Sequence, residues 1–204
     1  QGGESSLLAL DKRTGTVRWK TPRQSKRLTY SAPCLYKAPG RAEEIIFTNW
    51  QHGITGIDPK TGKVNWENDV FGKPAKERAI GSPIIADSLV IGTCGFVTKF
   101  KHIIALRPKG NHMEEAWRIE KSVPHIPTPL VYQDHMYLWA DIGIVSCVSM
   151  KTGRSVWRER IGGKFFGSPI CVDGRLFAID SQGVVVVGRP MTELAPDVHV
   201  LHRR

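Results

Sequence analysis

The side chains with catalytic potential are spaced in ways that exclude the common enzyme motifs. Lys60-Thr61-Gly62 and Lys151-Thr152-Gly153 match the K-T-G of serine β-lactamases, but the sequence has no S-x-x-K to supply the nucleophile. Gly162-Gly163-Lys164 lacks the G-x-x-x-x-G-K-[ST] spacing of a phosphate-binding loop. The seven histidines form no H-E-x-x-H and no paired spacing with cysteine, which argues against a zinc site.

Oxygen and sulfur ligands are present but scattered along the chain. The cysteines contain no C-x-x-C, so we expect buried thiols and no disulfide framework; they are Cys34, Cys94, Cys147 and Cys171. The loop residues that could contact a ligand are Asn49, Trp50, His52, Asp141, Asp180 and Gln182. Asp141 is a hard oxygen ligand of the kind that Ca²⁺ prefers. Because Asp141 and Asp180 come shortly before glycines, the favoured interpretation is turn formation, and we expect no catalytic residue and no metal site.

The elements that carry these residues are repeats of one segment. Ala9–Trp19 reads ALDKRTGTVRW, Gly56–Trp66 reads GIDPKTGKVNW and Cys147–Trp157 reads CVSMKTGRSVW. A looser copy, Ala105–Trp117, is two residues longer and has Arg107 in the aspartate position. A repeat of roughly 40 to 50 residues is typical of propellers and other repeat architectures.

Each copy predicts a β-hairpin that ends in a tryptophan strand. The Asp11 carboxylate can accept hydrogen bonds from turn amides, and Gly15 can adopt the positive φ that such a loop needs. The small residue that begins each copy suits a position that a ring approaches closely. The positions that we assign to this structural motif are Asp11, Thr14, Gly15, Trp19, Asp58, Thr61, Gly62, Trp66, Trp117, Thr152, Gly153 and Trp157.

A second motif recurs in step with the first and marks the start of each unit. It is Ser31-Ala32-Pro33, Gly81-Ser82-Pro83, Pro127-Thr128-Pro129 and Gly167-Ser168-Pro169, each followed by a short apolar run. Proline is tolerated at the first residue of a strand. Together the motifs predict an all-β propeller of four-stranded antiparallel blades, with little helix. The expected blades are about 1–20 (partial), 31–68, 81–120, 127–160 and 167–190 (partial, three strands), with a basic connector at 21–30.

The frame A-x-D-x-x-T-G-x-x-x-W resembles the tryptophan-docking motif of the PQQ-like, or quinoprotein-type, β-propellers. This family includes PQQ-dependent alcohol dehydrogenases and BamB-like outer-membrane-assembly propellers. The resemblance implies that each motif tryptophan packs against the neighbouring blade, and that the chain is part of a seven- or eight-bladed ring. Blade faces left uncovered would cause self-association. The resemblance also implies a periplasmic or cell-envelope location, although no signal peptide is visible at Gln1.

The same resemblance supplies the expected functions. Family enzymes hold PQQ with a vicinal Cys-Cys disulfide and a stacking Trp, beside Ca²⁺ and a catalytic Asp; no Cys-Cys pair occurs in this sequence. We therefore expect a non-enzymatic scaffold or partner-binding module without cofactor, whose partner is another protein or the remaining blades of the ring. The alternatives are the propeller portion of a PQQ-dependent dehydrogenase, with PQQ and calcium, and a ligand-sensing propeller of a signalling protein. The fold by itself does not choose between them.

Charge and hydropathy limit the possible partners. The net charge is +10, and basic residues cluster within 12–27 and within 151–164. Solvated turns and strand edges are the favoured interpretation; the alternative is an anionic partner such as lipid headgroups or polysaccharide. No nucleic-acid reader motif is present. No apolar run approaches the roughly 18 residues of a membrane helix. Trp50 is expected in a loop, where its truncation would cost less than that of Trp66 or Trp157.

Overall fold

The chain forms only strands and turns within the residues that its structure describes. The computed structural model describes residues 3–25, 29–71, 78–96, 99–190 and 198–201. Contacts divide the chain into two compact units, one of residues 1–96 and 104–116 and one of residues 97–103 and 117–204. None of the described segments is a helix long and apolar enough to cross a membrane.

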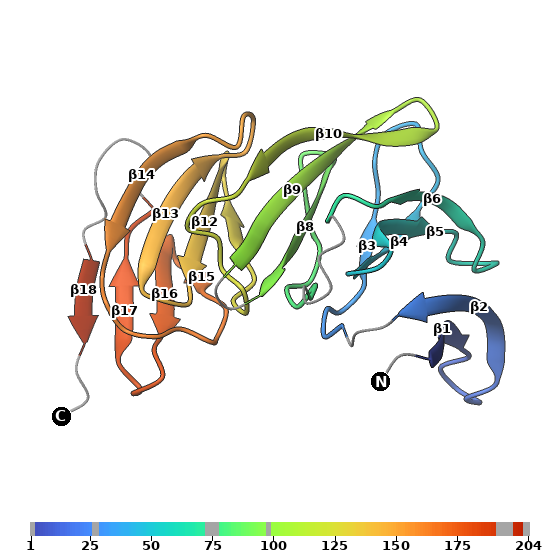
Figure 1. Cartoon of the computed structure of the whole chain (residues 1–204), viewed down its shortest axis with the longest axis horizontal. Coiled ribbons are helices and arrows are strands. Elements are labelled where there is room, and N and C mark those ends of the chain that lie inside the picture. Colours follow the sequence, from blue (N-terminus) through green and yellow to red (C-terminus); the bar gives the residue numbers. More distant parts are fainter. Residues whose placement is uncertain (1–2, 26–28, 72–77, 97–98, 191–197, 202–204) are drawn as a thin grey trace. The chain divides into compact units, whose positions relative to one another are not determined.

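Five antiparallel sheets follow one another along the chain, and the strands of each sheet are sequence neighbours (Figure 1). The first is a two-stranded sheet of β1 (Gly3–Leu10) and β2 (Val17–Ser25). The second is β3 (Cys34–Tyr36), β4 (Glu44–Asn49), β5 (Gly53–Ile57) and β6 (Val64–Asn68). The third is β7 (Ile84–Ala86), β8 (Leu89–Phe96), β9 (Lys99–Lys109) and β10 (His112–Ile119). The fourth is β11 (Leu130–Tyr132), β12 (His135–Ala140), β13 (Ile144–Ser149) and β14 (Ser155–Arg160). The fifth is β15 (Ile170–Val172), β16 (Arg175–Ile179), β17 (Val185–Gly188) and β18 (Val198–Leu201).

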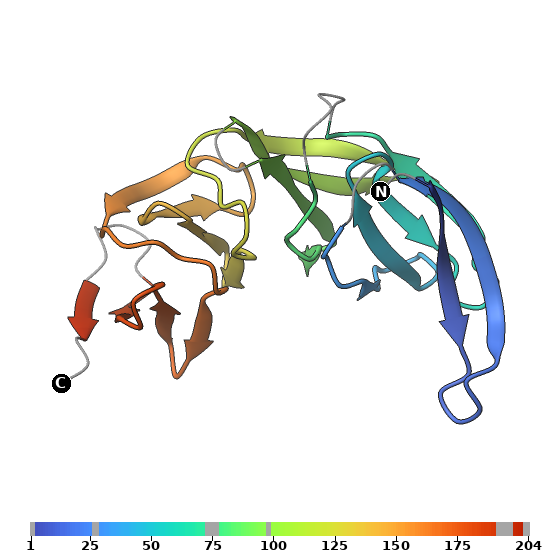
Figure 2. The same cartoon turned by 60° about the horizontal axis from the view of Figure 1, so that its bottom comes forward.

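The repeated segment forms the last hairpin of its sheet, with the same register in its three regular copies. Trp19 pairs with Ala9, Trp66 with Gly56 and Trp157 with Cys147, and the register shifts by one residue directly after each of these pairs. In Figure 2 the blue hairpin of β1 and β2 is a long ribbon that ends in this turn. The small residue lies opposite the tryptophan because a larger side chain would occupy the space of the indole ring.

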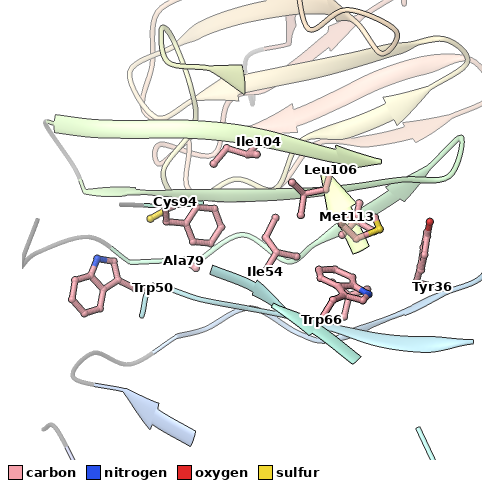
Figure 3. Packing of buried hydrophobic residues seen from close by; sticks show 12 residues of the cluster. Tyr36, Trp50, Ile54, Trp66, Ala79, Cys94, Ile104, Leu106 and Met113 are labelled. Carbon is pink, nitrogen blue, oxygen red and sulfur yellow. The ribbon is translucent and has the colours of Figure 1, made fainter. Parts of the chain in front are cut away.

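Each unit has its own apolar core. In the first unit the cluster runs from Trp50, Ala79 and Cys94 at one end to Trp66 and Met113 at the other (Figure 3). In the second unit a cluster that includes Trp139, Phe165 and Leu176 lies between the fourth and fifth sheets. All four cysteines are free, and burial raises the pKa of the Cys34 and Cys147 thiols to about 11, which disfavours the reactive thiolate.

Three sequence-based expectations differ from the structure. The expected connector at 21–30 is wrong for Thr21–Ser25, because β2 continues through these residues opposite β1. The last sheet has a fourth strand, β18, which pairs with β17, whereas three strands were expected. Val198–Leu201 contains neither the Thr-Gly nor the Trp from which the last strand of the other sheets was predicted. Trp50 follows β4 in a turn, as expected, but its side chain is 9% exposed and belongs to the core.

The first and last sheets expose apolar side chains. Leu8, Leu10 and Val17 are each more than half exposed on the first hairpin, as are Ile170 and Ile179 on the fifth sheet. Such side chains favour association. Self-association of the chain, which the sequence led us to expect, stays a prediction. Light scattering after size-exclusion chromatography would test it.

Candidate functional site

Three motif tryptophans lie where successive sheets meet, at places that we call the first, second and third joints. The first joint is Trp19 against the turn Asp58–Gly62, the second is Trp66 with Glu44 beside the turn at Gly110, and the third is Trp117 against the turn Ser149–Gly153. The first two joints lie in the first unit and the third in the second.

At the first joint, β2 places the indole of Trp19 on the turn that follows β5. The Trp19 Nε1–H donates to the carbonyl oxygen of Pro59 at 2.9 Å. A Cβ added to Gly62 would lie 2.6 Å from the Trp19 ring, and Gly62 has a φ of +74°. The turn therefore needs glycine at position 62 for two reasons: its backbone is left-handed, and the tryptophan ring fills the space that a side chain would occupy.

The third joint repeats this geometry. The Trp117 Nε1–H donates to the carbonyl oxygen of Met150 at 2.8 Å, and Met150 follows Ser149 as Pro59 follows Asp58. A Cβ on Gly153 would lie 2.8 Å from the Trp117 ring. Trp117 was the least regular copy in the sequence, yet it has the same type of partner as Trp19, because the receiving turn is the regular one.

The second joint is built differently. The Trp66 Nε1–H donates to the Glu44 carboxylate at 2.8 Å, on β4 of its own sheet. The Trp66 ring lies over Gly56, where a Cβ would come within 2.3 Å of the ring. The next sheet is reached by other groups: Asn68 donates to the carbonyl oxygen of Met113 at 2.9 Å and Arg41 to that of Gly110 at 2.7 Å. In the receiving sheet, β9 and β10 run on to a tight turn at Gly110 and Asn111.

Trp157 is half-buried and packs against Tyr137 of its own sheet, with ring centroids 6.2 Å apart. The connection from β17 to β18 contains residues 191–197, which lie outside the described part of the chain. The docking role expected for Trp157 therefore stays a prediction.

The polar motif residues hold the turns in shape. The Asp11 Oδ1 accepts from the N–H groups of Arg13 and Thr14, and Asp58 Oδ1 accepts from those of Lys60 and Thr61. The Arg18 side chain and these N–H donors lower the pKa of Asp11 to about 2. The hydroxyls of Thr14, Thr61 and Thr152 each accept from the N–H two residues on. These carboxylates and hydroxyls are used within the turn.

The proline motif also links neighbouring sheets. The Ala32 N–H donates to the Ser82 hydroxyl at 3.0 Å, and the Thr128 N–H donates to the Ser168 hydroxyl at 3.0 Å. In both cases the residue before one proline contacts the residue before the next. The sequence showed the repeat but gave no sign of this contact.

The loop residues considered as ligands are hydrogen-bonded within the protein. Asp141 accepts from the Lys101 ammonium at 2.8 Å and from the N–H groups of His125 and Ile126. Burial alone would raise the pKa of Asp141, but Lys101 and the His125 N–H more than offset it, so the pKa lies below its usual value. Asp180 Oδ1 accepts from the N–H groups of Gln182 and Val184, as a turn aspartate does.

The other loop candidates take part in contacts around the first joint. Asn49 donates to the Ser25 hydroxyl at 3.1 Å, and its Oδ1 accepts from Gln51. His52 lies between Gln24 and Glu67, with Nε2 2.7 Å from the Gln24 carbonyl and Nδ1 2.9 Å from Glu67. The structure therefore brings Asn49 and His52 to the β2 side of their sheet.

Glu44 is a site residue that the sequence analysis missed. It is 3% exposed and accepts from Trp66 and, at 2.8 Å, from Asn65. The sequence gives no signal for it, because apolar residues occur on both faces of β4; in the structure Glu44 lies on the same face as buried Ile46 and Thr48. A carboxylate on the core face of a strand needs such partners.

A family model described as outer membrane protein assembly factor BamB, of the PQQ_2 type, matches residues 1–107 and 99–189. This chain belongs to the BamB family of PQQ-like propellers. The prediction of an all-β propeller of four-stranded antiparallel blades is thereby confirmed, as is the family resemblance. A comparison with curated proteins found no significant match.

Solved structures have the same fold. The crystal structure of BamB from Moraxella catarrhalis is 20% identical, with a TM-score of 0.68, over 97% of this chain and 58% of that one. A quinohemoprotein alcohol dehydrogenase from Comamonas testosteroni is 14% identical, with a TM-score of 0.69, over 98% of this chain and 40% of that one. The BamB-family chain thus spans little more than half of the first of these structures.

Among the described residues, the thiols and carboxylates are not arranged as the resemblance implies for PQQ and Ca²⁺. The cysteines lie on separate strands, so no vicinal disulfide can form. Asp141, the best oxygen ligand by sequence, is paired with a lysine whose ammonium would repel a cation. Among the described residues, no group of three His, Cys, Asp or Glu side chains could hold a metal ion.

Proposed function

We propose that this BamB-family chain is a non-enzymatic propeller module that binds a protein partner in the cell envelope. The observation that carries the proposal is the family match, which extends over residues 1–107 and 99–189 and describes an outer membrane protein assembly factor. An assembly factor acts by contact with other proteins, and the same description supports the proposed envelope location.

The hydrogen bonds of the loop residues support a function that involves no catalysed reaction. A general acid or base needs a titratable group that can reach a substrate. Asp141 instead accepts hydrogen bonds from His125 and Lys101 of other segments, Asp180 accepts within its own loop, and the Glu67 carboxylate contacts His52 and Arg23. These carboxylates stabilise the structure, which suits a surface that recognises a partner by shape and charge.

The experiment is a titration of the chain with PQQ and Ca²⁺, followed by calorimetry, together with a dye-linked alcohol oxidation assay. We expect neither binding nor turnover. A quinohemoprotein alcohol dehydrogenase expressed in parallel controls for active cofactor. Stoichiometric PQQ binding with a Kd near or below about 1 μM, some −8 kcal/mol, would favour the dehydrogenase alternative and contradict the proposal.

A further inference from the structure

Beyond the tryptophans of the first and third joints, polar side chains lie beside the outer strand of the receiving sheet; we call these two places the first and second grooves, and the second contains a cavity. Counting from the tryptophan, Arg23 of the first groove corresponds to Lys121 of the second. Counting along the repeat, Glu67 corresponds to Arg158 and Thr55 to Ser146. Since Trp19 and Trp117 have the same contacts, these residues occupy equivalent positions, and the grooves can be compared residue by residue.

In the first groove a carboxylate lies between an arginine and a histidine. Arg23 donates to Glu67 at 2.8 Å and to the Thr55 hydroxyl at 2.8 Å, and its side chain is only 10% exposed. Burial alone would raise the pKa of Glu67, but His52 and Arg23 more than offset it and leave the pKa below its usual value. The chain thus supplies its own anion to this groove.

In the second groove the position of that anion holds an arginine. The groove has a volume of about 400 Å³ and is lined by Arg118, Lys121 and Arg158, with Glu120 as its one acidic residue. At its base, the buried Ser146 hydroxyl is 3.4 Å from Nε of Arg158. Cations gathered in one groove attract an anion and repel one another.

The rest of the lining is apolar. Leu138 and Val148 form the base and are almost fully buried, while Ile119 is half-buried at the side. The methylene stems of Lys121 and the two arginines add aliphatic surface below their charged ends. A ligand that combines one negative group with an apolar neighbour therefore matches the groove in both respects.

We propose that the groove between the end of β10 and strands β13–β14 binds an acidic segment of a partner protein. A glutamate or aspartate of that segment lies between Arg158 and Lys121 and supplies the carboxylate that Glu67 supplies to Arg23 in the first groove, and an adjacent apolar residue packs on Ile119. A carboxylate is favoured over other anions because a carboxylate fills the equivalent position in this same chain. The inference rests on the proposed function and names the chemistry of the partner.

The test measures binding of two fluorescein-labelled peptide pools by anisotropy. In one pool a single Glu is flanked by varied apolar residues within a Gly-Ser sequence, and in the other Gln replaces Glu. We expect the Glu pool to bind at least about tenfold more tightly, or 1.4 kcal/mol, and the difference to shrink as salt rises. Glu and Gln pools that bind equally, or not at all, would overturn the proposal.

Matched variants locate the binding. R158E places a carboxylate at the Glu67 position, where Lys121 can pair with it, so we expect the Glu pool to bind at least about tenfold more weakly. R175E makes the same change of charge at an exposed residue of β16, and this variant should bind the Glu pool as tightly as the unaltered chain does. K121Q, with circular dichroism to confirm folding, tests the site again if R158E does not fold.

The remaining outcomes separate this inference from the proposed function. If the Glu pool binds but R158E and K121Q bind it as R175E does, the groove assignment is wrong and the binding module stands. If R158E loses binding only to vesicles of phosphatidylglycerol in phosphatidylcholine, a lipid surface replaces the acidic segment. PQQ binding would contradict the non-enzymatic function while leaving the peptide result to be judged by itself.

Discussion

The first and third joints differ from the second in what the tryptophan meets. Trp19 and Trp117 donate to a backbone carbonyl of the next sheet's turn, whose glycine leaves room for the ring. Trp66 donates to a carboxylate of its own sheet and lies over Gly56. The second joint then relies on Asn68 and Arg41 to reach the following sheet.

The cause lies in the receiving turn. The copy at Ala105–Trp117 is two residues longer than the others and lacks the Asp and Thr that fold the regular turn. Its strands are instead extended to Gly110, with Glu114 paired to Arg107 and Lys109 across the hairpin. A tryptophan strand can therefore have a regular motif and still lack the regular partner, because that partner belongs to the next repeat.

The largest expected effect comes from removing a joint tryptophan. Trp117→Ala and Trp66→Ala should each lower the free energy of unfolding by about 3–5 kcal/mol, since both rings are buried and leave a cavity. Trp157→Ala should cost less, because its ring is only half-buried. Urea denaturation measures all three, and equal losses would contradict the distinction between buried and half-buried tryptophans.

Trp50→Ala belongs with the large effects. The sequence placed Trp50 in a loop and predicted a small loss, but its ring is part of the first unit's core. We therefore expect a loss similar to that of Trp66→Ala, and a loss below about 1 kcal/mol would mean that the Trp50 site collapses without a cavity.

Glycine substitutions distinguish the two kinds of turn. Gly62→Ala and Gly110→Ala both force alanine into a left-handed conformation, which costs about 1–2 kcal/mol. Gly62→Ala also pushes a methyl group against the Trp19 ring, whereas a Cβ at Gly110 meets no heavy atom within 4 Å. Thermal denaturation should show the larger loss for Gly62→Ala.

A double mutant separates the clash from the backbone strain. With Trp19→Ala also present, Gly62→Ala should cost no more than Gly110→Ala, because the ring is gone. Strict additivity of the two changes would mean that the ring does not contact the turn in solution.

Glu44→Gln tests the alternative partner at the second joint. The charged acceptor of Trp66 and Asn65 is replaced by an amide that can accept less and must place its own N–H₂, so we expect a loss of about 1–3 kcal/mol. Glu43→Gln changes the exposed neighbour, which pairs with Lys37 at the surface, and should be nearly neutral. If Glu44→Gln left the free energy of unfolding unchanged, Trp66 would need no charged partner.

The smallest effect is a pH dependence of the regular turn. Hydrogen bonds from the Thr61 and Lys60 N–H groups lower the pKa of Asp58. A lowered folded-state pKa gives stability that is present above the unfolded value, about 3.9, and is lost as pH falls through the folded value. Asp58→Asn keeps the acceptor and removes the charge, so the urea midpoints of the two proteins should differ slightly at pH 7 and converge near pH 2. A difference that grows on acidification would contradict this assignment.

The sequence by itself determined the repeat, and the repeat determined the sheets. Asp58, Thr61 and Gly62 act through neighbours in the chain, so a local pattern identifies the turn they make. Proline and small residues marked strand starts and tryptophan partners for the same reason. The strand β18 was not predictable, because Val198–Leu201 acquires its place only by pairing with β17.

Only the tertiary structure decided which partner each tryptophan has and which groove is charged. Trp66 donates to Glu44 of its own sheet because the turn of the next sheet, at Gly110, belongs to a copy that is two residues longer than the regular one. The sequence around Trp66 does not indicate this partner. The groove at Arg158 is cationic because Arg118 of β10 and Lys121, shortly after that strand, line it too. In a repeat protein the contacts between neighbouring repeats join positions about one repeat apart. The motif that contains a residue therefore determines the local backbone conformation, whereas the motif of the next repeat determines what the side chain contacts.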